Sequence, residues 1–307
     1  MRRGRDSLNF GTLYLIPTPL GDNDIAWVIP AAVRQCVAGL GDYIVEHPKT
    51  ARQFLKQVGC VLPLQEIRMQ VLNEHTPVKE FASLLTPLLA GTDVGLLSEA
   101  GCPAVADPGA GLVRLAHQRN LRVIPLVGPS SILLALMASG LNGQRFVFHG
   151  YLPAEKNKRV STLVELERVS IGCDQTQIFI ETPYRNQKLL ESVVFTCHDD
   201  TVLCIACDLT MASEYISTRT VGEWKRALPE LQDKPTVFLL QGNRAPSNKF
   251  SAESAAASKS DVHKTPGERR SRLSIQRSVT ENRDVKPCVE LCGGKREGPV
   301  GNLSHKL

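Results

Sequence analysis

The chain has 307 residues, of which 42% are hydrophobic and 22% charged, and this balance excludes a wholly disordered or collagen-like protein. The length is typical of about two domains. The net charge of +5 gathers at one end: residues 243–307 carry 13 Lys and Arg against 7 Asp and Glu, whereas residues 1–242 carry 23 against 24. The nearly neutral body excludes a protein that coats nucleic acid through a globally basic surface.

Residues 11–148 are expected to form an N-terminal α/β domain after a flexible segment, 1–10. Short apolar runs without period-2 alternation are separated by helical patterns, as in a parallel sheet covered on both faces. The predicted strands are Thr12–Ile16, Asp42–Val45, Asp93–Leu97 and Leu121–Pro125. The predicted helices are Ala26–Val37, Thr50–Val58, Val78–Leu89, Ala110–Gln118 and a helix that begins at Ser130.

Two apolar segments resemble membrane signals but are better interpreted otherwise. The start MRRGR followed by an apolar stretch is similar to a signal peptide, yet Asn9, Gly11 and Thr12 interrupt it and two prolines follow, so we predict a strand. Residues 123–144 carry no charge. The helix from Ser130 is too short to cross a bilayer, so we predict a buried core helix.

Residues 149–242 are expected to form a second α/β domain, and residues 243–307 a disordered basic tail. The predicted strands are Phe146–Phe148 at the joint, Thr176–Glu181, Thr201–Cys207, Glu214–Thr220 and Thr236–Leu240. The predicted helices are Lys158–Arg168, Arg185–Thr196 and Gly222–Leu228. From Asn243 the apolar pattern collapses, and such a segment buries too little surface to offset its ordering entropy.

Three loops at the carboxyl ends of predicted strands share an unusual composition. They read PTPLGD (Pro17–Asp22), SEAGCPAVADPG (Ser98–Gly109) and LVGPSS (Leu126–Ser131). Ligands of open parallel sheets bind at this edge, and Gly and Pro allow close approach to bare backbone. Ser130 is placed to cap the next helix, whose N-terminus favours a carboxylate or phosphate. Ordinary tight turns are the alternative for one loop, but three together favour a ligand site.

Other ligand classes find little support. No G-x-G-x-x-G follows the first strand and no G-x-x-x-x-G-K-[ST] occurs, which disfavours NAD and ATP. Cys204 and Cys207 are spaced like a metal pair, but an odd separation along a strand points their thiols to opposite faces, and we expect no metal. The nine scattered cysteines fit a reduced, cytoplasmic setting.

The chain resembles the tetrapyrrole methylase superfamily, and within it the ribosomal small-subunit RNA methyltransferase I group. The likeness is carried by GTLYLIPTPLGD, LSEAGCPAVADPGAGLV and PLVGPSSILLALMASGLNGQRFVFHGYLP, and continues through ETPYRNQKLLE, ACDLTMASE and KPTVFLL. It is collinear over about residues 11–241. It implies two α/β domains with S-adenosylmethionine in a cleft between them, a homodimer, and methyl transfer as the activity.

Carried over residue by residue, the resemblance implies a set of cofactor contacts in both domains. They are Pro17, Thr18, Pro19, Leu20, Ser98, Glu99, Ala100, Gly101, Cys102, Pro103, Gly128, Pro129, Ser130, Ser131, Ile132, Thr182, Pro183, Ala206, Pro235 and Thr236. Backbone carbonyls of the loops suit the sulfonium cation and the adenine edge, and the two serine hydroxyls suit the amino-acid end. Methyl transfer is an in-line displacement, for which positioning supplies much of the rate.

Carboxylates at the strand ends are the candidate catalytic groups. Glu46, Glu99, Asp107 and Glu181 all follow predicted strands. One can act as a base toward a ribose hydroxyl, or they can simply satisfy loop amides. Glu46 and Glu99 are the predicted catalytic residues. His75, in NEHT after a helix-like stretch, is expected to make only a polar contact.

The predicted substrate is RNA of the small ribosomal subunit, methylated on a ribose 2'-oxygen. The sequence departs from the group where an acidic EDTR-like stretch is usual, because VEHPKTAR keeps Glu46 but places His47 and Pro48 after it. Two alternatives stay open. The acceptor can be a tetrapyrrole or another small molecule, or the chain can be a non-catalytic relative that binds RNA.

Overall fold

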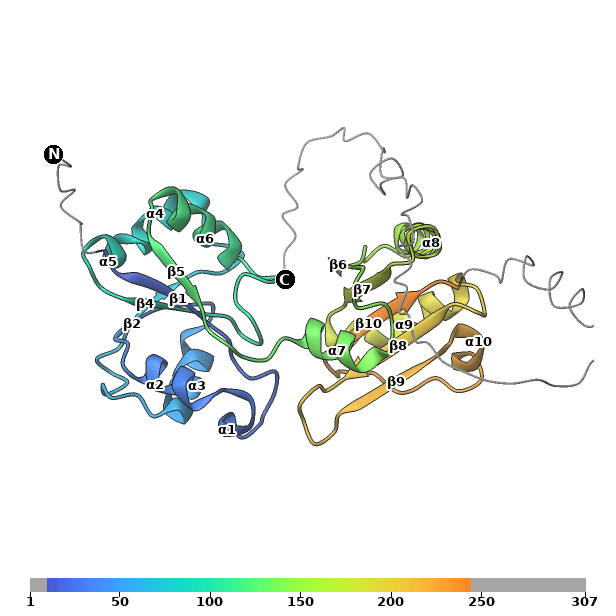
Figure 1. Ribbon diagram of the computed structural model, residues 1–307, viewed down its shortest axis with the longest axis horizontal. Helices are drawn as coiled ribbons and strands as arrows, with labels where there is room; N and C mark the ends of the chain where they lie inside the picture. Colours follow the sequence, from blue (N-terminus) through green and yellow to red (C-terminus); the bar gives the residue numbers. More distant parts are fainter. Residues whose placement is uncertain (1–9, 244–307) are drawn as a thin grey trace, which may run out of the picture. The chain divides into compact units, whose positions relative to one another are not determined.

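The protein is described by a computed structural model over residues 10–243, which contains two five-stranded sheets (Figure 1). The chain up to Asn243 groups into one compact unit. The predicted flexible N-terminus, except Phe10, and the predicted disordered tail after Asn243 lie outside the described residues. The tail cysteines Cys288 and Cys292 lie there as well.

The first sheet is parallel throughout, as the sequence predicts. Its order is β3-β2-β4-β1-β5. The strands are β1 (Thr12–Ile16), β2 (Asp42–Val45), β3 (Arg68–Val71), β4 (Val94–Leu97) and β5 (Arg122–Pro125). The sequence analysis missed β3, an edge strand with exposed ends whose RMQV sequence has no apolar run.

Helices cover both faces of the first sheet (Figure 1). One layer is α1 (Ile25–Val28), α2 (Ala31–Ala38) and α3 (Pro48–Val58). The other is the 3-10 turn η1 (Val78–Glu80), α4 (Phe81–Leu84), α5 (Thr86–Leu89) and α6 (Gly109–Gln118). The single helix predicted over 26–37 is wrong: Pro30 separates α1 from α2, because proline removes a helical hydrogen-bond donor. The one predicted over 78–89 likewise divides into three short pieces.

The second sheet is mixed, in the order β6-β7-β10-β8-β9. Only β6 and β7 are parallel, and the other neighbours are antiparallel. The strands are β6 (Phe146–Tyr151), β7 (Thr176–Ile180), β8 (Val202–Cys207), β9 (Tyr215–Thr220) and β10 (Thr236–Gln241). The helices are α7 (Ser131–Ser139), α8 (Lys156–Cys173), η2 (Pro183–Arg185), α9 (Asn186–Thr196) and α10 (Val221–Trp224). The predicted helix 158–168 is thus longer at both ends, whereas the one predicted over 222–228 ends at Trp224.

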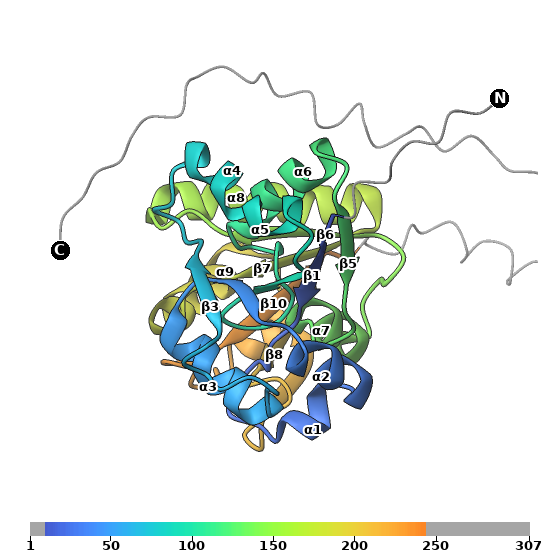
Figure 2. The same cartoon turned by 90° about the vertical axis from the view of Figure 1, so that its left-hand side faces the viewer.

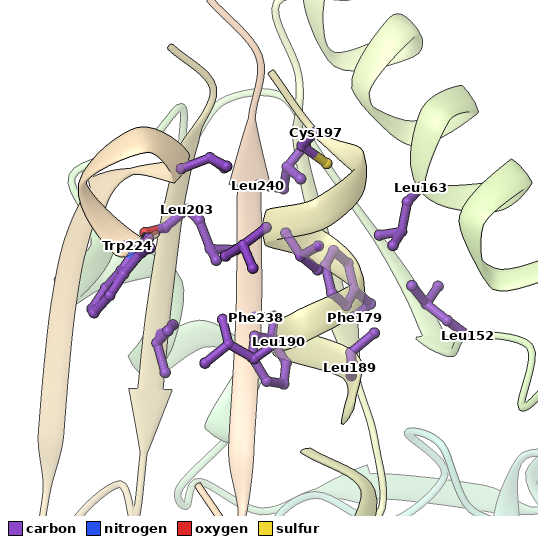
Figure 3. Close-up of a cluster of buried hydrophobic side chains, with 14 of the residues drawn as sticks. Leu152, Leu163, Phe179, Leu189, Leu190, Cys197, Leu203, Trp224, Phe238 and Leu240 are labelled. Carbon is purple, nitrogen blue, oxygen red and sulfur yellow. Dashed lines mark hydrogen bonds between the residues drawn. The ribbon is translucent and has the colours of Figure 1, made fainter. Parts of the chain in front are cut away.

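The larger core of the second sheet lies under α8, α9 and α10 (Figure 3). The rings of Phe179 and Phe238 stack with centroids 5.8 Å apart. The buried indole of Trp224 donates to the Leu203 carbonyl over 2.9 Å, so its one polar group is satisfied. Cys207 joins this core, whereas Cys204 belongs to the core under α7 on the other face, which confirms the predicted opposite facing.

Helix α7 packs on the second sheet, although it precedes the predicted domain boundary after residue 148. Ala135 and Leu136 are buried there against strand residues such as Ile178. The predicted buried core helix is buried on one side only, because the Met137 side chain is 80% exposed and Leu133 is 52% exposed. Within residues 10–243, no helix is long and apolar enough to span a bilayer.

Candidate functional site

A large cavity of about 880 Å³ opens at the carboxyl ends of the first sheet and along one edge of the second. The predicted Gly/Pro loops after β4 and β5 line it, together with Leu20 from the loop after β1. From the second sheet come Phe148, Tyr151, Ile180, Pro183, Leu209, Met211, Pro235, Thr236 and Val237. Figure 2 shows the two sheets in a view turned by 90°.

The register of the second sheet explains why distant segments meet at one edge. The start of β10 pairs with the ends of two antiparallel neighbours: Val237 lies opposite Ile180 and Thr236 opposite Cys207. Strand β6 runs parallel to β7, so its end reaches the same edge. The mixed sheet therefore presents the ends of β6, β7 and β8 and the start of β10 side by side.

The loop after β1 ties several walls of the cavity together. Thr18 and Gly101 exchange two backbone hydrogen bonds of 3.0 and 3.1 Å, which joins this loop to the one after β4. Gly101 has a φ of +74°, a left-handed conformation that favours glycine. The same β1 loop reaches the second sheet, because the Asn23 side-chain amide donates to Thr210 Oγ1 over 2.8 Å.

The loop after β4 holds two strained residues beside the cavity. Ala104 and Ala106 have φ values of 66° and 59°, a region that costs a non-glycine residue on the order of 1 kcal/mol or more. The Asp107 carboxylate accepts from the Ala104 and Gly109 amides over 2.8 and 2.7 Å. Burial raises the pKa of Asp107 although these two amides lower it. Asp107 thus stabilises the strained loop through these two hydrogen bonds.

The loop after β5 approaches the first loop closely. A Cβ on Gly128 would lie 2.4 Å from Pro17 Cβ, so only glycine fits without displacing that proline. Ser130 occupies the N-cap position of α7, but its side chain makes no capping hydrogen bond, contrary to expectation. The first-turn amides of α7 are thus left open at a cavity wall that Ser130, Ser131 and Ile132 form.

The four candidate carboxylates have different surroundings. Glu181 is 5% exposed and accepts from the Thr182 amide and from the Arg185 guanidinium, 2.8 and 2.7 Å away. Glu99 accepts from the Thr50 hydroxyl over 2.7 Å and lies 3.4 Å from His47 Nδ1. These contacts hold both side chains in place.

Glu46 is the least constrained of the four. Within residues 10–243 its carboxylate has no side-chain hydrogen-bond partner. Burial raises the pKa of Glu46, and the Asp107 and Glu99 carboxylates raise it further, although the Glu99 backbone amide and His47 lower it. A carboxylate with a raised pKa is a stronger base than an ordinary glutamate.

A small cavity of about 250 Å³ adjoins the large one, and Glu46 belongs to both. The residues that the two cavities share are Leu20, Glu46, Ser98, Glu99 and Ala100. One wall of the small cavity is the β1 loop from Thr18 to Asp22. The other is α3, which contributes Thr50, Gln53, Phe54 and Gln57.

Most of the predicted contact residues line one of these cavities. They are Thr18, Pro19, Leu20, Ser98, Glu99, Ala100, Gly101, Cys102, Ser130, Ser131, Ile132, Pro183, Pro235 and Thr236. The rest are not among the lining residues, and their role in binding stays a prediction. They are Pro17, Pro103, Gly128, Pro129, Thr182 and Ala206.

Sequence reasoning missed the wall that follows β3. Asn73, Glu74 and His75 line the large cavity, and they follow a strand rather than the helix-like stretch expected before His75. The Asn73 carboxamide accepts from the His75 amide over 3.0 Å and fixes this turn. A polar cluster at the end of a parallel strand was the available signal, but it was hidden because the strand itself was not recognised.

Comparison with known proteins decides the family. A search of family models finds no match. The chain is 30% identical to the ribosomal RNA small subunit methyltransferase I of Vibrio cholerae serotype O1 over 236 residues, which is 76% of this chain and 77% of that protein. The chain belongs to the ribosomal RNA small subunit methyltransferase I family. The Escherichia coli O157:H7 protein of this name is 29% identical over 238 residues, 76% of this chain and 79% of that one.

The fold agrees with this membership. The crystal structure of the methyltransferase CobJ matches with a TM-score of 0.52 at 18% identity, covering 77% of this chain and 96% of that one. The α/β fold predicted from the sequence is therefore similar to that of CobJ. As a member of this family, the chain is a methyltransferase, which confirms the predicted enzyme class.

Proposed function

We propose that the chain methylates RNA of the small ribosomal subunit on a ribose 2'-oxygen. The names of its relatives support this substrate. The observation that carries the choice of a hydroxyl acceptor is Glu46, a half-buried carboxylate of raised pKa at the junction of the two cavities. A ribose hydroxyl is a weak nucleophile that benefits from a base in the transition state.

The residues of the large cavity fit S-adenosylmethionine, which supplies an electrophilic methyl group on a sulfonium cation. The open N-terminus of α7 and the Ser131 hydroxyl, which has no partner within residues 10–243, suit the carboxylate of its amino-acid part. Among residues 10–243 no Lys or Arg lines the cavity, whereas Glu46, Glu99 and Asp107 do, so the field of these residues favours a cation. All the predicted contacts are proposed as its binding residues.

The proposed mechanism assigns different roles to the two predicted catalytic residues. Glu46 accepts the proton of the acceptor hydroxyl, because its carboxylate is free of side-chain partners and its pKa is raised. Glu99 positions Glu46 through its backbone amide, while Thr50 and His47 hold the Glu99 side chain. Binding of the two reactants in adjoining cavities aligns the displacement.

The test is transfer of the labelled methyl group from S-adenosylmethionine to small ribosomal subunits from cells that lack this gene. Mass spectrometry of the RNA nucleosides then identifies the product. A 2'-O-methyl nucleoside that is missing from the deletion strain is the expected result. Methylation of a base would overturn the ribose assignment, and methylation of a tetrapyrrole but not RNA would favour the small-molecule alternative. Cofactor binding without turnover on any substrate would favour a non-catalytic relative.

We further propose that the enzyme is a cytoplasmic homodimer. Helix α7 is apolar all round, yet leaves Leu133 and Met137 exposed, as expected where a second copy covers that face. Sedimentation velocity of the purified chain should give a dimer. Met137→Glu should convert the dimer to a monomer. Val78→Glu, at an equally exposed position in the turn η1, should leave the dimer intact.

A further inference from the structure

Helix α3 carries three distinct stripes of side chains. Ala51, Phe54 and Leu55 are buried against the first sheet. Thr50, Gln53 and Gln57 recur at spacings of three and four residues and line the small cavity. The third stripe is basic and consists of Lys49, Arg52 and Lys56, again three and four residues apart. At about 100° per residue, the polar stripe lies between the apolar and the basic ones.

The small cavity has the lining of a site for a flat heterocycle. Its apolar lining residues include Phe54, Val45 and Leu97. The carboxamides of Gln53 and Gln57, which also line it, have no hydrogen-bond partner among the residues that the structure describes. Each carboxamide offers two donors and an acceptor, which can read the hydrogen-bonding edge of a nucleobase.

The basic stripe is available to a polyanion. No carboxylate of residues 10–243 lies within 4.0 Å of Lys49, Arg52 or Lys56, and all three residues are exposed. Neither cavity has a Lys or Arg in its lining. A phosphate is therefore favoured outside on α3, whereas an uncharged base is favoured within the small cavity.

We propose that the small cavity is the acceptor-base site for a single-stranded RNA segment whose phosphates run along Lys49, Arg52 and Lys56. This inference rests on the proposed function. A nucleotide held in this way has its base beside Gln53 and Gln57 and its sugar toward Glu46, where the small and large cavities join. Helix α3 is then the element that selects the nucleotide, and the second sheet does not take part in that choice.

The base site is tested with the double variant Gln53→Leu with Gln57→Leu, which keeps side-chain volume and removes the carboxamides. Its kcat/KM for small ribosomal subunits should fall roughly tenfold or more, mainly through KM, because two hydrogen bonds to the acceptor are lost. Calorimetric affinity for S-adenosylhomocysteine should stay within about twofold of wild type. The matched control is Gln35→Leu with Gln118→Leu, two glutamines of α2 and α6 outside both cavities.

The phosphate stripe is tested with Lys49→Gln, Arg52→Gln and Lys56→Gln together. The measurement is the affinity for a mixed-sequence single-stranded RNA 12-mer at several salt concentrations. The slope of log affinity against log salt concentration should become about 2 less steep, because each lost phosphate contact contributes about 0.7. The control triple is Arg114→Gln, Arg119→Gln and Arg122→Gln, which removes the same charge on α6, at its C-terminal end and on β5. Its slope should equal that of wild type.

The outcomes separate this inference from the proposed function. If wild type methylates RNA but the α3 variants behave like their controls, the base site and phosphate stripe are wrong and the function stands. If wild type methylates no RNA, the proposed function fails. Binding of the RNA 12-mer is then the remaining test of the RNA surface on α3. Equal affinities and slopes for the α3 and control variants would then overturn the RNA surface too. A loss confined to the α3 variants would retain it.

Discussion

The two sheets contribute to the large cavity in different ways. The parallel first sheet ends all five strands at one edge, so each βα loop reaches the site automatically. The mixed second sheet must combine three strand ends with one strand start, and it supplies mostly apolar residues. Every carboxylate of the large cavity except Glu181 comes from the first sheet. The first sheet thus supplies most of the carboxylates of the cavity, and the second sheet supplies a mostly apolar wall.

The largest expected effect is at the first sheet's catalytic edge. Glu46→Gln should lower kcat by roughly 10²–10⁴-fold, the range typical of a lost general base, with S-adenosylhomocysteine affinity nearly unchanged. Because a base must be deprotonated to act, wild-type kcat should fall as the pH drops through the Glu46 pKa. That acidic limb should lie above the ordinary glutamate range, since burial raises this pKa. A Glu46→Gln enzyme with wild-type kcat would exclude the base role.

The next largest effect is expected for a phenylalanine in the core of each sheet. Phe238→Ala, in the core of the second sheet, should lower the free energy of unfolding by about 3–5 kcal/mol. Phe54→Ala should lower the free energy of unfolding by a similar amount. Because Phe54 also lines the small cavity, this variant should in addition bind RNA more weakly at temperatures where it is folded. Urea unfolding and RNA titration of both variants measure the difference. Equal RNA affinities would remove Phe54 from the site.

A smaller effect is expected where two loops of the first sheet meet. Gly128→Val places a Cβ against Pro17 and should destabilise the fold by about 1–3 kcal/mol through overpacking. It should also weaken S-adenosylmethionine binding, because displacing Pro17 moves the neighbouring Thr18–Gly101 bridge. Calorimetry and thermal melting test this. A variant with unchanged folding and affinity would show that the predicted loop contacts are misassigned.

The smallest effect concerns a single hydroxyl at the start of α7. Ser131→Ala should weaken S-adenosylmethionine binding by about 1 kcal/mol, or roughly fivefold, and leave stability nearly unchanged. Ser161→Ala, on the exposed surface of α8, is a control that should alter neither quantity much. If both variants bind the cofactor as tightly as wild type, the anion site at α7 is not used.

Much of the architecture could be predicted from the sequence because buried strands are continuous apolar runs. The bounds of β1 and β2 agree with the prediction residue for residue. Strand β3 escaped because an edge strand buries little and carries no such run. Helix breaks at Pro30 and within 78–89 depend on how each turn packs, which periodicity does not specify.

The site was predictable where backbone chemistry makes loops distinctive, and not elsewhere. The Gly/Pro loops led to Ser98–Cys102 and Ser130–Ile132, which line the large cavity. The wall after β3, with Asn73 and His75, looks like any polar turn until the sheet order brings it alongside. The sequence left open whether Asp107 and Glu181 act as a base or satisfy loop amides, because the choice depends on distances to particular amides and to Arg185.

The four edge strands also bear on how copies of the chain can associate. Edge strands invite pairing with another chain, and proteins discourage this with charges, prolines and bulges. Here β3 carries Arg68, β5 ends in Pro125, β9 carries Arg219, and β6 shifts register between Phe148 and Tyr151. Growth of a continuous sheet across molecules is disfavoured at every edge. A stable pair of subunits must instead bury helical surface, which gives the chain protection against aggregation without preventing dimer formation.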